Sequence, residues 1–201
     1  MPLGANKAAI MGVAGVSTGD VVLLSSQTAS SDSTISFTSG IDSTYGEYIF
    51  KFYNIHPSNT SGPELTFQCN ATDSTSYDEN ITSTAFYIYH TEAGSGGAFA
   101  YIPGLDQQNS DAAEQPIIMN IGADADESGI GELHLFNLAS TTYVKHWYAF
   151  GTSVTHAVGD PNNEVLHTAG YINTTTAIDD IRFSVSAGNM DTGTIKMWGV
   201  K

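Results

Sequence analysis

The sequence predicts an all-β protein, an antiparallel β-sandwich of the jelly-roll type. Short runs of β-branched, aromatic and aliphatic residues recur along the chain, and each run ends at Gly, Ser, Asn, Asp or Pro. This pattern is typical of short strands joined by turns. Long helical periodicity is nearly absent, and strands without helical crossovers pair mostly antiparallel. A sandwich or a barrel satisfies these conditions.

Twelve runs are expected to form the strands. In chain order they are residues 21–24, 34–37, 48–53, 65–69, 85–89, 98–102, 116–121, 132–136, 143–150, 165–171, 180–185 and 194–198. The run 180–185 alternates strictly, which favours a sandwich with one buried and one open face. Its buried set is Ile181, Phe183 and Val185, and its open set is Arg182, Ser184 and, just beyond it, Ser186.

The run 48–53 differs because it is apolar or aromatic on both faces apart from Lys51. We therefore expect a central strand, either covered on both sides or with an outer face that meets another subunit.

Length and charge limit the domain count and the partners. The 201 residues fit one sandwich domain, over 21–201, preceded by an arm over 1–20. Six Lys and Arg oppose 21 Asp and Glu, which gives a formal charge of −15. This charge repels nucleic acids and anionic membranes, so neither is an expected partner. The N-terminus has no apolar stretch long enough for a secretion signal or a membrane span, so we expect synthesis in a cytoplasm.

The first twenty residues are small and apolar, and Gly12 and Gly15 interrupt them. Such a segment favours an arm that becomes ordered on another subunit. A flexible leader without a role is the alternative.

The sequence predicts that the chain is not an enzyme. Cys69 alternates with apolar neighbours, as a small buried hydrophobe would. His134 and His146 are expected on neighbouring strands, where two histidines could bind a metal, although lone surface histidines are commoner. A glycosidase would need two carboxylates on either side of a groove, and four glutamates are candidates for such a pair. No two of them are paired in sequence. They are Glu47, Glu64, Glu132 and Glu164.

One loop resembles the first half of a calcium site. Asp124, Asp126 and Ser128 would supply oxygen ligands, and Gly129 follows at the sixth place. Leu135 occupies the twelfth place, where a bidentate glutamate is expected. The loop is either a structural calcium site or a plain acidic turn, and no other cofactor is expected.

Aromatic side chains are the other candidate site. Trp147 and Trp198, with Tyr87 and Tyr89, could stack on sugar rings or pack at a subunit interface. Core packing explains the same residues, because aromatic side chains contribute large burial energies.

The second half of the chain resembles a family of marine and cyanobacterial phage structural proteins. The segments that carry the resemblance are 131–137 (GELHLFN), 140–145 (STTYVK), 169–178 (AGYINTTTAI), 181–183 (IRF), 186–189 (SAGN) and 193–199 (GTIKMWG). The stretch 45–67 also fits. The resemblance implies an oligomeric virion component with a lectin-like jelly roll, located on the capsid or on a tail appendage. It supplies no catalytic residues.

We therefore expect a non-enzymatic capsid cement or decoration protein. Trimers would bridge shell subunits and stabilise the particle by mass action. The alternative is a tail-fibre or receptor-binding module that binds host surface glycans. The expected partners are further copies of the chain and capsid or tail proteins, with host glycans under the alternative.

Overall fold

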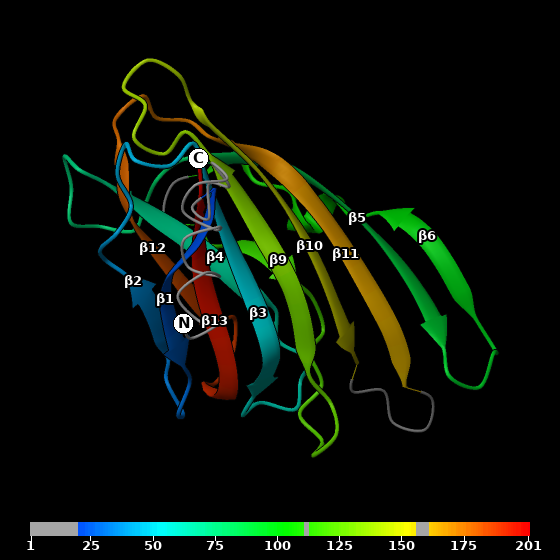
Figure 1. The fold of residues 1–201 in the computed structure, drawn as a ribbon. Coiled ribbons are helices and arrows are strands. Elements are labelled where there is room, and N and C mark those ends of the chain that lie inside the picture. Colours follow the sequence, from blue (N-terminus) through cyan, green and yellow to red (C-terminus); the bar gives the residue numbers. More distant parts are fainter. Residues whose placement is uncertain (1–19, 111–112, 156–160) are drawn as a thin grey trace, which may run out of the picture.

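The structure, a computed structural model, describes residues 20–110, 113–155 and 161–201 (Figure 1). It confirms an all-β sandwich of two packed antiparallel sheets. The jelly-roll assignment stays a prediction. The expected arm lies outside the described residues except for Asp20. No helix in the described part of the chain is long and apolar enough to cross a membrane.

The large sheet has the strand order β1-β13-β3-β9-β10-β11-β5-β6, and β7 also pairs with β5. The small sheet has the order β2-β12-β4-β8. The strands are β1 (Val21–Thr28), β2 (Thr34–Phe37), β3 (Glu47–Pro57), β4 (Leu65–Ala71), β5 (Ile81–Thr91), β6 (Gly97–Tyr101), β7 (Gln108–Ser110), β8 (Gln115–Ile118), β9 (Gly129–Phe136), β10 (Lys145–Val154), β11 (Asn162–Ile172), β12 (Ile178–Val185) and β13 (Met190–Val200); a short 3-10 turn, η1 (Pro103–Leu105), follows β6.

All twelve expected runs fall on strands, with shifted ends. Three runs extend beyond their strands: residue 102 follows the end of β6, residues 119–121 follow the end of β8, and residues 143–144 precede β10, which begins at Lys145. The three-residue strand β7 was not predicted. Its segment has too few apolar residues to show alternation.

The main core lies between the sheets and is rich in aromatic rings. Phe183 of β12 is fully buried, and the centre of its ring lies 5.1 Å from that of Phe50 and 5.2 Å from that of Phe52, both on β3. Edge-to-face and tilted rings at such spacing add about 0.5–1.5 kcal/mol per pair to their burial energy. Ile181, Phe183 and Val185 are buried, as the alternation of the run 180–185 predicts.

A smaller core cluster lies where the large sheet extends beyond the small one. Leu166 of β11 and Ala85 of β5 are buried there with Met119. Leu105 of η1 packs against them, so the connection after β6 covers this end of the sheet. In Figure 1, β6 forms the far edge of the large sheet.

A bulge bends the pair β3 and β13. Asn54 has φ +51° and Gly193 has φ +133°, and the register shifts on both strands here. A Cβ at residue 193 would lie 3.0 Å from the carbonyl oxygen of Asn54, so the bulge requires glycine at this place.

Candidate functional site

The outer face of the small sheet is polar. The Arg182 guanidinium lies 2.9 Å from the Glu114 carboxylate, and Ser184 and Thr66 donate hydrogen bonds to the same carboxylate. Arg182 also lies over the ring of Tyr77, 4.5 Å from its centre. Arg182 points away from the core, as predicted. Ser184 is on the same side but is buried, because Glu114 covers it.

The outer face of the large sheet is apolar and aromatic. Of the eleven large hydrophobic side chains that are exposed in the described part of the chain, ten lie on it. The pairing of the strands places them on one side of the sheet. We name this surface the aromatic face; its ten residues are Val21, Leu23, Tyr53, Phe86, Ile88, Phe99, Tyr101, Ile130, Tyr148 and Phe150.

The aromatic face is nearly free of net charge. Its strands β1, β13, β3, β9, β10, β11, β5 and β6 place only four Asp, Glu, Lys or Arg residues there, and the two positive and two negative charges cancel. The formal charge of −15 therefore belongs to the rest of the chain. The four residues are Glu47, Lys51, Glu132 and Lys196.

Rows of residues run across the face from strand to strand. One row passes from Glu132 through Phe150 and His167 to Phe86. The rings of Phe86 and His167 stack with their centres 4.9 Å apart, and Phe150 meets His167 edge-on at 4.8 Å. These contacts hold the exposed rings in fixed positions, which lowers the entropy cost of binding a partner.

A histidine between two carboxylates lies beside this row. Nδ1 of His134 is 2.5 Å from Oε1 of Glu47, and Nε2 is 3.4 Å from Oε1 of Glu132. The imidazole ring stacks on Tyr148 with centres 4.5 Å apart. Two of the four glutamates named as candidates for a glycosidase pair, Glu47 and Glu132, thus contact His134. Glu132 also pairs with Lys51 at 3.4 Å.

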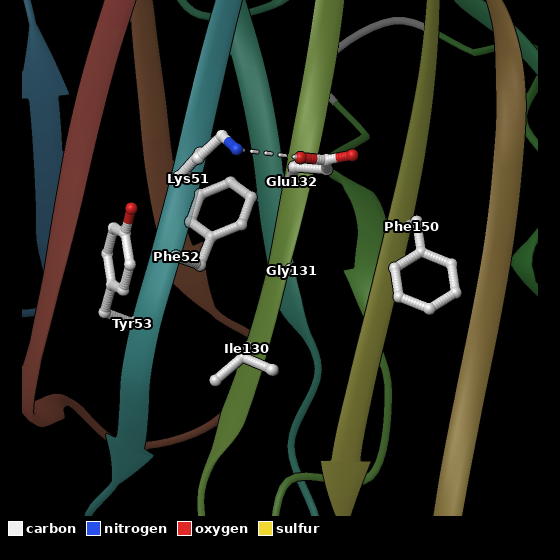
Figure 2. Close-up of a pocket in the computed structure, with 7 residues that line it drawn as sticks. All are labelled: Lys51, Phe52, Tyr53, Ile130, Gly131, Glu132 and Phe150. Carbon is white, nitrogen blue, oxygen red and sulfur yellow. Dashed lines mark ion pairs between the residues drawn. The ribbon is translucent and has the colours of Figure 1, made fainter. Parts of the chain in front are cut away.

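A groove of about 370 Å³ opens on the aromatic face between β3, β9 and β10. Figure 2 shows Tyr53 and Phe150 on opposite sides of it, the ion pair of Lys51 and Glu132 at one end, and Ile130 at the other. The groove thus joins apolar walls to one donor and one acceptor, the composition of many ligand pockets. Its floor is made by Phe52 and Gly131.

The two predicted tryptophans have different environments. Trp147 is 2% exposed, and its ring meets Phe67 of the small sheet edge-on at 5.0 Å. It belongs to the core, so the prediction that it contacts sugars or subunits needs correction. Trp198 lies on the aromatic face, half-buried between its cross-strand partners Leu23 and Ile49.

The paired tyrosines of β5 lie on the opposite side of the sheet from the aromatic face. Tyr87 and Tyr89 stack on each other with centres 5.8 Å apart. Tyr87 packs against the smaller core cluster. They therefore form a separate surface from the groove.

The loop from Asp124 to Ser128 is closed by its own glutamate. Oε2 of Glu127 accepts a hydrogen bond of 2.8 Å from the Asp124 amide, and the Glu127 amide donates to the Asp124 carbonyl at 2.9 Å. Asp126 is exposed, whereas Glu127 is buried. The described residues contain no group of three or more His, Cys, Asp or Glu that could hold a metal. The calcium site stays a prediction.

Two other groups considered for chemistry are buried. Cys69 is fully buried, as predicted, and burial raises the pKa of its thiol well above the usual value. Such a thiol is a poor nucleophile. Burial also raises the pKa of Glu164, whose Oε2 accepts a hydrogen bond of 2.8 Å from Asn120. Glu164 faces the smaller core cluster and lies apart from the groove.

Comparison of the chain with family models, with curated proteins and with solved structures finds no match. The fold and the aromatic face therefore carry the functional argument, and the likeness to phage structural proteins stays a prediction.

Proposed function

We propose that this chain is a non-enzymatic structural protein of a bacteriophage virion, a capsid cement or decoration protein. It binds neighbouring shell subunits through the aromatic face. The observation that supports this proposal is the gathering of ten exposed large hydrophobic residues on one sheet face without net charge. Protein interfaces are enriched in aromatic residues and depleted of charge at their centres, and contiguous exposed apolar patches mark interaction sites.

The mechanism is thermodynamic. A protein that binds the assembled shell and not its separated subunits stabilises the shell by mass action, by about 2.7 kcal/mol when its free concentration is a hundred times Kd. Phe150 and Ile130, at the centre of the large sheet, are placed to act as anchors. The ion pair of Lys51 and Glu132 beside them fixes the register of the contact.

The groove supports a second candidate, a receptor-binding module for host glycans. Tyr53 and Phe150 could stack on the apolar faces of sugar rings, while Lys51 and Glu132 would hydrogen-bond the hydroxyl groups. The observation that favours this candidate is the placement of one ion pair at the end of a groove with two aromatic walls.

Location on the particle tests the main proposal. Cryo-electron microscopy of intact virions is expected to show density for this sandwich on the capsid lattice. Density on the tail alone would favour the receptor-binding candidate. If purified virions of the phage that encodes this chain do not contain it, both the capsid proposal and the receptor-binding candidate are refuted.

The contact face is tested by adding a charge at its centre. Capsids from which the native chain has been removed are mixed with the purified chain and sedimented. Phe150→Glu should weaken this co-sedimentation, because burying an unpaired carboxylate in the contact costs binding free energy. The matched control is Tyr143→Glu, since Tyr143 is 72% exposed and lies in a loop outside the aromatic face. Equal binding by the two variants would contradict the assignment of the face.

The glycan candidate is tested with a glycan array. Specific binding by the intact chain, lost with Tyr53→Ala and kept with Tyr143→Ala, would support it. A flat array would exclude it. Trp147→Ala is unsuitable for this purpose because Trp147 lies in the core.

A further inference from the structure

The strand β6 leaves one edge of the large sheet open. Ile102 donates its amide to the carbonyl of Ala85 at 3.1 Å, and Thr91 donates to the carbonyl of Gly96 at 3.0 Å. Because backbone groups of an antiparallel strand alternate in direction, the even-numbered residues of β6 bond to β5. The backbone groups that point away from the sheet are those of Gly97, Phe99 and Tyr101.

This edge lacks the features that normally keep a sheet edge apart from other strands. Natural edge strands carry lysine, proline or inward-pointing charges. No charged residue occurs between Glu92 and Asp106, and β6 itself contains no proline. Phe99, at its centre, is 68% exposed. An open, uncharged edge with an exposed aromatic residue is a site for strand pairing.

The sequence of β6 complements itself. Antiparallel pairing of two copies about Phe99 sets Phe99 opposite the same residue of the second copy, and Ala98 opposite Ala100. Gly97 then faces Tyr101, so the tyrosine ring meets no opposing side chain. A two-fold interface requires this kind of match, because the same patch must serve both subunits.

Electrostatic repulsion between two copies is weakest at this edge. Two chains of formal charge −15 repel each other over most of their surfaces. The stretch from 93 to 105 carries no charge, so the proposed pairing sets no like charges opposite each other along β6 itself; Glu92 and Asp106 lie at its two ends.

We propose that two copies of this chain join β6 to β6 about a two-fold axis at Phe99, which continues the large sheet from one subunit into the other. The two aromatic faces then form one larger surface. Two-fold pairing builds dimers, in place of the trimers expected from the sequence. The proposal goes beyond the virion function and is tested on the purified chain alone.

Sedimentation equilibrium measures the association. The intact chain is expected to form dimers, and Phe99→Lys should raise the dimer dissociation constant roughly tenfold or more, because it sets two ammonium groups opposite each other. Tyr143→Lys is the matched control and should dimerise as the intact chain does. Phe99 is exposed, so the variant should keep its fold, as far-ultraviolet circular dichroism can verify.

A disulfide tests the register. Cα atoms of a hydrogen-bonded antiparallel pair lie about 5.5 Å apart, within the range that a disulfide can bridge. With oxidised glutathione as oxidant, Phe99→Cys should form a covalent dimer linked through residue 99, whereas Tyr143→Cys should not. The native Cys69 is buried and does not compete.

Several results would overturn the proposal. These are a monomeric intact chain, a Phe99→Lys variant that dimerises normally, or a Phe99→Cys variant without the 99–99 disulfide. A trimer would do so too, since a two-fold β6–β6 interface alone closes as a dimer. None of these results bears on the presence of the chain in virions, so the two proposals fail separately.

Discussion

The Lys145 ammonium group donates a hydrogen bond of 2.7 Å to the carbonyl oxygen of Ser140. It also donates to the carbonyls of Tyr143 and Thr174, at 3.2 and 3.1 Å. Burial lowers the pKa of this lysine. Lys145→Met should lower the free energy of unfolding by about 2–4 kcal/mol, because three carbonyls lose a charged donor. Urea denaturation measures this, and a loss below about 1 kcal/mol would show that water replaces the donor.

Glu164 should destabilise the fold at neutral pH. Burial raises the pKa of Glu164, so the folded state favours the protonated form. The stability that the protonated Glu164 contributes is fully present below the ordinary pKa of 4.5, and it is lost as pH rises through the pKa of Glu164 in the folded state. Glu164→Gln should therefore raise the free energy of unfolding at pH 7 and change it little at pH 4. Urea titrations at both pH values test this, with Glu92→Gln at an exposed site as control.

Glu114 should show the opposite dependence. Burial raises its pKa, but hydrogen bonds from Ser184 and Thr66 and the charge of Arg182 outweigh burial, so the pKa is lowered. Its contribution is present above the ordinary pKa of 4.5 and is lost as pH falls through the folded value. Glu114→Gln should cost about 1–3 kcal/mol at pH 7. An equal cost at pH 7 and at a pH below the folded pKa would contradict this assignment.

The two tryptophans should differ sharply in their effect on stability. Trp147→Ala opens a cavity in the main core and should cost about 3–5 kcal/mol. Trp198→Ala, on the aromatic face, should cost clearly less because the side chain of Trp198 is only partly buried in the free chain. Thermal or urea unfolding measures both, and equal costs would show that the indole of Trp198 packs as tightly as that of Trp147.

The strands could be predicted because alternation is a local property. The run 180–185 shows its buried face within six residues, and β12 follows it. The run 48–53 was predicted as a central strand, and β3 does lie inside the large sheet. Its outer residue Tyr53 is 41% exposed, so the described chain does not cover the outer face of this strand. The other alternative, an outer face that meets another subunit, stays a prediction.

The aromatic face could not be predicted, because it depends on strand order. Phe150, His167 and Phe86 belong to three strands whose adjacency does not follow from the sequence. The same holds for His134, which lies between glutamates of β3 and β9. For Trp147 both core packing and surface contact stayed open for a related reason, since the parity of β10 decides whether a tryptophan faces the core or the solvent. The other residues of that strand do not alternate clearly enough to show which side faces the core.

If the protein coats a particle as proposed, the separation of charge from the aromatic face affects the surface of that particle. If the face is turned inward, most of the negative charge of each copy is left on the surfaces that contact water. A coated particle thereby acquires a negatively charged outer surface. Two such particles repel each other within about a Debye length, roughly 8 Å at physiological salt. The coat would act as a colloidal stabiliser whose effect weakens as the salt concentration rises.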